Sequence, residues 1–229
     1  MISAVDDAGM ATVRVGVAAA LREGDAALAL QMASGLLAEG IPMAEVVDQV
    51  LAPIQVVVGE GWEVGDVSVA EEHAGTATLE TLMSLLAGAF DQPADADLVV
   101  IATAEGDRHS LPARMAGALL AYEGYRTRVL GATLPAADLA EYLVATRADV
   151  LVVSCARPAS LLGARACVEA GHSAGAPVLV GGRAFGVGDH RWRAIGADAR
   201  ADTLPDMVRI LDRAGPGVTT GAPGRGPRP

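Results

Sequence analysis

One short segment of this 229-residue sequence, Asp107-x-His109, combines residue types that could hold a metal. It follows residues 98–104, an apolar run typical of a buried strand, so His109 is expected in the loop after that strand. A carboxylate that accepts a hydrogen bond from one ring nitrogen fixes the tautomer of an imidazole and frees the other nitrogen for a metal. The pair predicts a metal ligand, His109, oriented by Asp107. An ordinary loop histidine near a helix start is the alternative.

Two later apolar runs also end in small residues. Residues 149–155 contain Ser154, and residues 176–182 end in Gly181-Gly182. Small side chains at neighbouring strand ends let a flat or elongated group approach the backbone closely. A glycine pair is common at strand ends and is weak evidence alone. Because neither G-x-G-x-x-G nor a P-loop follows the first strand, nucleotide binding is not indicated.

A second histidine stands beside a carboxylate at Glu72-His73, ten residues after Trp62. Aromatic residues make up only 3% of the chain, so an isolated tryptophan here is conspicuous. Ser68 and Glu71 have the spacing of a capping box, which predicts that Glu72 and His73 lie in the first turns of a helix. Taken singly, Trp62 could be an aromatic at a bundle edge and His73 a surface histidine.

Strand and helix patterns alternate after the polar linker 91–97. The expected strands are residues 98–104, 125–131, 149–155, 176–182 and 198–203, and the expected helices are 110–123, 134–148, 158–175 and 204–214. This order predicts an α/β domain over residues 96–214, a doubly wound, Rossmann-like (flavodoxin-like) parallel five-stranded sheet. Ligand loops then lie at the carboxyl ends of the strands. Residues 215–229 are rich in Gly, Pro and Thr and are expected to be disordered.

Helical patterns fill the first part of the chain. Four helices are expected within residues 8–92, over 12–25, 25–40, 42–62 and 68–90. Pro53 should kink or divide the third helix, because proline has no N–H to donate. Short connections between four helices predict an N-terminal four-helix bundle.

Composition narrows the class of protein. The net charge of −11 disfavours direct contact with nucleic-acid phosphates. Cys155 and Cys167 lie in apolar runs and are expected to be small buried thiols. Neither a signal peptide nor a charge-free run of about 18 apolar residues is present. We therefore expect a cytoplasmic protein with no membrane span.

The spacing of the loop residues resembles the cobalamin-binding domain family. Ser154 follows His109 by forty-five residues and Gly181-Gly182 follows Ser154 by twenty-seven, which matches D-x-H-x-x-G, S-x-L and G-G. The resemblance implies that His109 is the lower axial ligand of cobalt and that Asp107 orients it. It implies further cofactor-binding positions at Arg108, Leu111, Ser154, Ala156, Gly181, Gly182 and Arg183, several of which line the pocket for the nucleotide tail. Two positions depart from the motifs: Pro112 replaces glycine and Ala156 replaces leucine.

The arrangement Trp62-x(9)-Glu72-His73 resembles light-sensing cobalamin proteins of the CarH/LitR type. The resemblance implies that the bundle covers the upper face of the corrin and that Trp62 and Val69 pack on the upper axial group, commonly 5′-deoxyadenosyl. It also implies that Glu72 contacts the adenosine sugar. After light removes the alkyl group, His73 would become the upper axial cobalt ligand.

The expected function is a cobalamin photoreceptor that binds adenosylcobalamin or another alkylcobalamin and is not an enzyme. Only about ten residues precede the first expected helix, so a DNA-binding domain is not expected in this chain. The output would pass through a homo-oligomer or a regulatory protein partner. A corrinoid carrier for a methyltransferase system and a cobalamin storage or trafficking module remain the alternatives.

Overall fold

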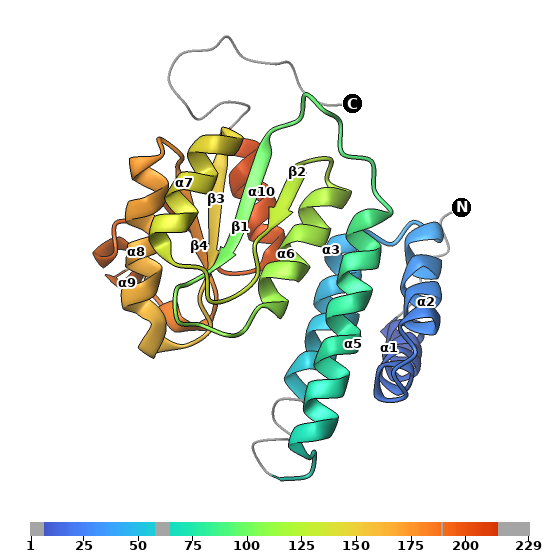
Figure 1. Ribbon diagram of the computed structural model, residues 1–229. Coiled ribbons are helices and arrows are strands. Elements are labelled where there is room, and N and C mark those ends of the chain that lie inside the picture. The colour runs from blue at the N-terminus through green and yellow to red at the C-terminus, as the bar shows by residue number, and fades with distance from the viewer. Residues whose placement is uncertain (1–6, 58–64, 189, 215–229) are drawn as a thin grey trace. The chain divides into compact units, whose positions relative to one another are not determined.

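The computed structural model describes residues 7–57, 65–188 and 190–214. The chain divides into two compact units, residues 1–90 and residues 91–229 (Figure 1). The first unit is helical and the second is α/β, as predicted. No helix within these described ranges is long and apolar enough to cross a lipid bilayer.

Helices of the first unit pack around an aliphatic core. They are α1 (Asp7–Arg22), α2 (Ala26–Ala38), α3 (Met43–Val46), the π-helical turn η1 (Val47–Leu51) and α5 (Val69–Gly88). Helix α1 begins at Asp7, earlier than expected, and includes the buried Met10. The fully buried side chains include Val17, Met43, Leu51, Leu79, Leu82 and Met83. Burial of this aliphatic surface is the main force holding the bundle together.

The predicted break at Pro53 takes the form of η1, the π-helical turn that precedes it. In an α-helix the carbonyl of Gln49 would accept the N–H of residue 53, but proline has none. The guanidinium of Arg14 donates to the Gln49 carbonyl instead, at 3.1 Å. A side chain of α1 therefore satisfies the backbone group that proline leaves unpaired.

The second unit contains the five predicted strands. They are β1 (Leu98–Thr103), β2 (Arg126–Val129), β3 (Val150–Ser154), β4 (Val178–Gly181) and β5 (Ala199–Ala201). All pairs are parallel and the order is β2-β1-β3-β4-β5. The predicted doubly wound five-stranded sheet is confirmed.

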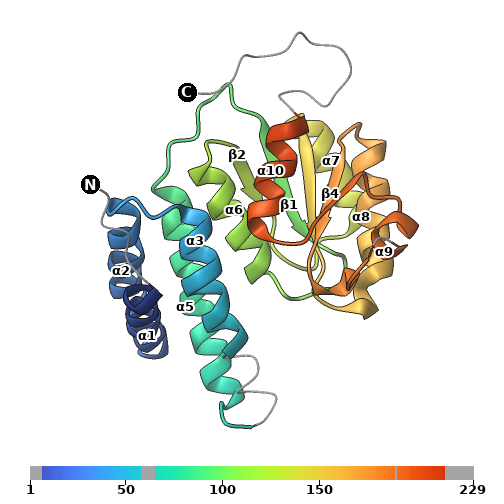
Figure 2. The same ribbon diagram turned by 180° about the vertical axis from the view of Figure 1, so that it is seen from behind.

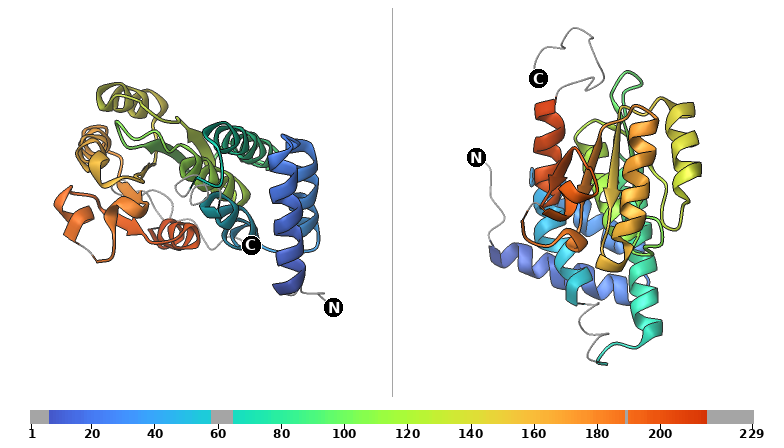
Figure 3. Two further views of the ribbon diagram at one scale, coloured as in Figure 1. Left: turned by 90° about the horizontal axis from the view of Figure 1, so that it is seen from below. Right: turned by 90° about the vertical axis from the view of Figure 1, so that its left-hand side faces the viewer.

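Helices cover both faces of this sheet. The longer ones are α6 (Leu111–Tyr122), α7 (Ala136–Thr146), α8 (Leu161–Ser173) and α10 (Leu204–Ala214), and short helical turns are η2 (Pro158–Ser160), η3 (Arg183–Phe185) and α9 (His190–Ala194). Helices α7 and α8 lie on one face, and α6 and α10 lie on the other (Figure 3, left). Figure 2 shows α10 in front of the sheet.

Because all strands are parallel, their carboxyl ends meet at one edge of the sheet. Thr103 at the end of β1 pairs with Ser154 at the end of β3, and Ser154 pairs with Gly181 at the end of β4. The connection from β1 leads to β2 on one side and the connection from β3 leads to β4 on the other, which makes the space at the ends of β1 and β3 the topological switch point. Open α/β sheets bind ligands at this place.

Candidate functional site

The loop that follows β1 carries the predicted histidine and its carboxylate. Nδ1 of His109 lies 2.6 Å from Oδ1 of Asp107, which also accepts the backbone N–H of His109 at 3.1 Å. An ionised carboxylate can only accept, so Nδ1 carries the proton and Nε2 keeps its lone pair. The His109 side chain is 54% exposed. The ring therefore presents a bare nitrogen, as a metal ligand must.

The second oxygen of Asp107 ties this loop to the loop after β3. Oδ2 accepts the backbone N–H groups of Ala156 at 2.7 Å and Arg157 at 3.1 Å. Burial of Asp107 is complete and by itself raises the pKa of the carboxyl. Hydrogen bonds from His109, Ala156 and Arg157 outweigh that effect and leave the pKa below its ordinary value. The switch point is thus built around an anion that orients His109.

Close backbone packing joins the ends of β3 and β4. Gly182 has φ +114°, and a Cβ there would lie 2.2 Å from the carbonyl oxygen of Cys155. Only glycine fits this position. The Cys155 carbonyl in turn accepts the N–H of Ala184 at 3.2 Å. This is a contact between two backbone segments of the protein, and the predicted approach of a flat or elongated group to the glycine pair stays a prediction.

Open space lies over the sheet beside that contact. A Cβ added to Gly181 would meet one atom within 4 Å, the carbonyl oxygen of Ala201 at 3.5 Å. In the same row of paired residues, Thr103 and Ser154 are buried. The row therefore offers two hydroxyl groups and a gap at the glycine.

The other residues predicted for this edge of the sheet differ in their exposure to solvent. Arg108 and Arg183 are exposed, and Ala156 is half-buried beside the Asp107 carboxylate. Leu111 is a buried side chain at the start of α6, where its role is packing. Pro112 follows it in the first turn of the helix, a position that tolerates proline.

Sequence reasoning missed two residues of this edge. Thr103 is the last residue of β1, and the signal for it is a hydroxyl at the end of an apolar run. Gly163 lies in the first turn of α8, where a Cβ would fall 1.9 Å from the Glu105 carbonyl oxygen. No sequence pattern indicates that contact, since it joins two distant loops.

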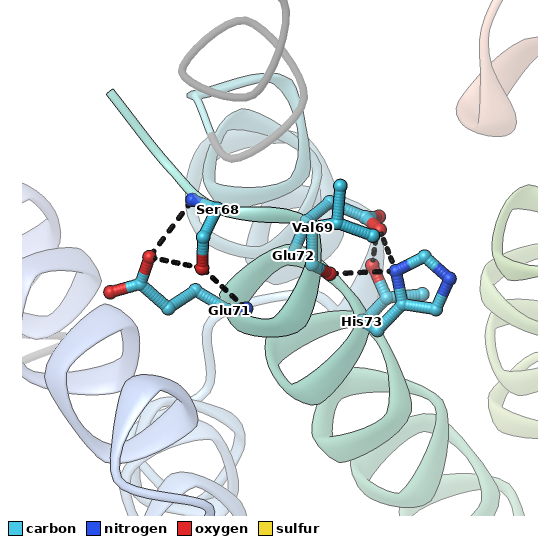
Figure 4. Close-up of polar contacts among 6 residues, drawn as sticks. Ser68, Val69, Glu71, Glu72 and His73 are labelled. Atoms are coloured by element: carbon cyan, nitrogen blue, oxygen red, sulfur yellow. Dashed lines mark hydrogen bonds and ion pairs between the residues drawn. The ribbon is translucent and has the colours of Figure 1, made fainter. Parts of the chain in front are cut away.

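In the first unit, the predicted capping box begins α5. The Ser68 hydroxyl accepts the Glu71 N–H at 3.2 Å, and Oε2 of Glu71 accepts the Ser68 N–H at 2.9 Å. The hydrogen bonds from the side chain and backbone of Ser68 hold the pKa of Glu71 below its ordinary value. The box fixes the start of the helix that bears Glu72 and His73 (Figure 4).

His73 is oriented by its own helix. Its Nδ1 lies 2.8 Å from the Val69 carbonyl oxygen and 2.9 Å from Oε2 of Glu72. Both partners are acceptors, so Nδ1 is protonated and Nε2 keeps its lone pair. The ring points away from α5 on the side opposite to Glu71 (Figure 4) and is 74% exposed. The geometry around His73 thus repeats that around His109, with a bare Nε2.

The neighbours of His73 are also defined. Oε1 of Glu72 accepts the hydroxyl of Thr76 at 2.8 Å, so both carboxylate oxygens are anchored. Val69, one turn earlier, is an exposed apolar side chain. Trp62 lies outside the described residues, as does the segment 215–229, and the predictions for both remain untested.

The fold and the oriented histidine define a class, an α/β cofactor-binding protein with its site at the switch point of the sheet. Comparison with protein families gives the particular family. The model described as "B12 binding domain" matches residues 98–219, and a second model with the same description matches residues 13–87. The chain belongs to the B12 binding domain family.

Several known proteins are similar to this chain. The HTH-type transcriptional repressor CarH of Myxococcus xanthus is 33% identical over 116 residues, which are 50% of this chain and 38% of the repressor. The chain thus matches well under half of that relative's length. The solved monomethylamine corrinoid protein of Methanosarcina barkeri has a TM-score of 0.68 at 20% identity, over 86% of this chain and 96% of that one, and shows the same fold. A cobalamin-binding protein of Desulfitobacterium hafniense DCB-2 has a TM-score of 0.48 at 20% identity, over 88% and 97%.

The described residues fit this cofactor. Cobalt takes imidazole nitrogen as a ligand, and the bare Nε2 of His109 is available at the strand edge. A Cβ at Gly181 would have one neighbour within 4 Å among the described residues, and the hydroxyl of Thr103, at the end of β1, is buried with no hydrogen-bond partner among them. An exposed imidazole and a buried, unpaired hydroxyl at one edge of the sheet are compatible with a metal-containing cofactor bound there.

Proposed function

We propose that this chain is a cobalamin-dependent light sensor rather than an enzyme. His109 would hold the cobalt through Nε2 in the dark, and His73 would hold it through a second nitrogen after light. Adenosylcobalamin, or another alkylcobalamin, is the proposed form of the cofactor. The change at His73 alters the conformation or the assembly of the protein, which signals to a homo-oligomer or a regulatory protein partner.

When bound, the cofactor would supply a cobalt ion and a cobalt–carbon bond that visible light breaks. The protein supplies nitrogens in the right protonation state. Nδ1–H of His109 donates to the buried Asp107, which selects the tautomer of the neutral ring that has its lone pair on Nε2. Nδ1–H of His73 donates to Val69 and Glu72 with the same result.

The orientation of His73 is the single observation that carries the proposal. In this protein a carbonyl one turn back and a carboxylate hold the ring, and the Glu72 carboxylate is held by Thr76. The capping box at Ser68 adds rigidity to the same turn. The identity to CarH over half of this chain supports the proposal.

Signalling follows from the position of His73 on α5. This helix contacts α1 and α2, so a pull on its first turns would be transmitted to the rest of the bundle. A ligand that binds one arrangement more strongly than another shifts the population between them. The proposed output is therefore a shift in bundle conformation or self-association.

A methyl carrier is the competing proposal, since a carrier would also need His109 but would have no use for a second histidine ligand. The test is to load the apoprotein with adenosylcobalamin in the dark and record absorption spectra before and after green light. Wild type, His73→Ala and His109→Ala are compared. His172→Ala is the matched control, because His172 is also a partly exposed histidine beside a carboxylate, Asp198.

We expect illuminated wild type and His172→Ala to share one stable spectrum that His73→Ala lacks. The absorption spectrum of His109→Ala should differ from that of wild type already in the dark. If His73→Ala and wild type have the same spectrum after light, the sensor proposal is wrong and the carrier proposal takes its place. Size-exclusion chromatography of dark and illuminated wild type then measures the change of assembly.

A further inference from the structure

Charge is unevenly divided between the two units of the chain. Residues 1–90 contain thirteen of the 28 acidic residues but only two of the 17 basic ones, Arg14 and Arg22, so they account for the whole net charge of −11. Both arginines lie on α1, and both line one cavity of the helical unit. An acidic unit that gathers its two cations around a cavity is suited to hold an anion there.

The cavity has a volume of about 530 Å³, within the range of pockets that hold small organic molecules. Helix α1, the helical residues 52–57 and α5 form its walls. Two of the lining residues, Val15 and Val57, are 70% and 67% exposed, so the cavity opens to solvent. Most of the lining side chains are apolar, and they include Val15, Ala18, Leu21, Ile54, Val67 and Leu79.

The cavity lies on the side of α5 away from His73. Glu71 lines the cavity, and Figure 4 shows Glu71 and His73 pointing to opposite sides of the helix. The Glu71 carboxylate is held in the capping box by Ser68, and the positive charge of Arg22 also acts on it. Asp66, just before α5, lines the cavity as well. Carboxylates therefore already compensate the charge of Arg22.

Arg14 lies two turns from Arg22 on α1, about 12 Å along the helix axis. Its half-buried guanidinium donates one N–H group to the Gln49 carbonyl at 3.1 Å and forms no ion pair with a carboxylate among the described residues. A guanidinium has five N–H donors in a planar fork that matches a carboxylate. Burial removes part of the water around a charge, so a counterion that binds at Arg14 is favoured.

We propose that this cavity binds an apolar monocarboxylate of the medium-chain fatty acid class. The carboxylate pairs with Arg14, and the hydrocarbon chain lies against the apolar walls in the direction of Arg22. One anion on a flexible apolar chain matches one uncompensated cation beside an apolar cavity, and removal of the chain from water supplies much of the affinity. The inference concerns the helical unit alone and depends neither on cobalamin nor on light.

Calorimetric titration of the full-length apoprotein tests the site with sodium octanoate as the probe. Octan-1-ol has the same chain without the charge, and octyltrimethylammonium has the opposite charge. Arg14→Met removes the cation and keeps an unbranched side chain. Gly75→Leu fills the cavity, because Gly75 lines it and nothing lies within 4 Å of a Cβ at that position. Gly35→Leu of α2 is the matched control, with the same open space for a Cβ at a position that does not line this cavity.

We expect octanoate to bind wild type at one site, more tightly than octan-1-ol does, and to raise the melting temperature. Arg14→Met should raise the Kd for octanoate roughly 10- to 100-fold, the effect of losing a charge-assisted hydrogen-bonded pair, and leave the Kd for octan-1-ol unchanged. Gly75→Leu should bind neither probe, whereas Gly35→Leu should bind both as wild type does.

Equal affinity of Arg14→Met and wild type for octanoate would overturn the inference, as would wild-type binding by Gly75→Leu. Folded wild type that gives no saturable signal with octanoate would also refute it. Tighter binding of octyltrimethylammonium than of octanoate would mean that the carboxylates of the unit select the ligand, which contradicts the role of Arg14. Thermal melting reports the folding of each variant, and if Arg14→Met does not fold, the two leucine variants and the two charged probes decide.

Discussion

Oδ1 of Asp107 lies 2.6 Å from Nδ1 of His109, and the other oxygen of the same carboxylate accepts two backbone N–H groups from the loop after β3. One buried anion thus sets the tautomer of the histidine and fixes two loops at the switch point. A histidine that is held in this way needs no rearrangement before it binds a metal through Nε2.

Replacing Asp107 by asparagine should weaken cofactor binding by about 10- to 100-fold, as loss of the group behind a metal-bound histidine commonly does. An amide has one accepting oxygen, so its NH₂ group would face either His109 or the N–H groups of Ala156 and Arg157. Titration of each apoprotein with cobalamin in the dark measures the effect.

Asp149→Asn is the control for this prediction. Oδ2 of Asp149 accepts the Leu98 N–H at 2.7 Å, at the start of β1 and away from His109. This substitution should lower the free energy of unfolding and leave the Kd for cobalamin near its wild-type value. If both variants reduced affinity equally, the effect would lie in general stability and the orienting role of Asp107 would be refuted.

Gly163→Ala should displace the loop that carries His109. The added methyl group would lie 1.9 Å from the Glu105 carbonyl oxygen, a backbone atom that can move only with its loop. We expect a loss of about 1–3 kcal/mol in the free energy of unfolding and weaker cofactor binding. In Gly35→Ala of α2 nothing lies within 4 Å of the new Cβ, so it should gain about 0.5–1 kcal/mol. Urea titrations that give the same change in the free energy of unfolding for Gly163→Ala and Gly35→Ala would contradict the close contact of Gly163 with the Glu105 carbonyl.

Arg14→Met should destabilise the bundle by about 1 kcal/mol, because the Gln49 carbonyl loses its donor. The cost should depend on Pro53. Alanine at position 53 restores an N–H that can serve the same carbonyl, so Arg14→Met should cost less in a Pro53→Ala background. A double-mutant cycle measured by urea unfolding gives the coupling. No coupling would mean that Arg14 acts only through general packing.

Burial raises the pKa of the Cys155 thiol to about 12, and the negative charge of Asp107 adds to the effect. Burial also raises the pKa of Cys167. In the unfolded chain a cysteine ionises near pH ~8.5. Because the folded pKa values are the higher ones, the folded state keeps its protons longer, and stability should fall as the pH rises above ~8.5 toward 12.

Two measurements check the behaviour of the thiols. Urea midpoints should be lower at pH 10 than at pH 8, and Cys155→Ala should reduce this difference. Iodoacetamide at pH 8 should modify neither cysteine of the folded chain and both cysteines of the unfolded chain, since thiolates are the reactive form. Rapid alkylation of Cys155 in the folded protein would contradict its burial.

The sequence allowed prediction of the elements and of the central pair. Apolar runs rich in β-branched residues predicted the central strands, and the alternation with helices predicted the short β5, whose sequence has no β-branched residue. The same alternation predicted a parallel sheet. Asp107 and His109 are two residues apart, so their contact is local and could be predicted from the sequence. The same holds for the capping box of Ser68 and Glu71.

Contacts between distant segments could not be predicted. The place of Thr103 at the site depends on its pairing with Ser154 in the sheet. The need for glycine at position 163 depends on a close backbone carbonyl 58 residues earlier in the chain. The contact of Arg14 with Gln49 requires knowledge of how α1 packs on η1. Such relationships depend on three-dimensional packing, which periodicity and spacing do not encode.

The most direct measurement is cobalt K-edge X-ray absorption on the protein loaded with adenosylcobalamin, before and after green light. Fine structure at this edge counts the imidazole rings bound to cobalt. The account predicts one ring in the dark and two after light for wild type, and one ring after light for His73→Ala. A single ring in illuminated wild type would contradict the proposal that His73 is the second ligand.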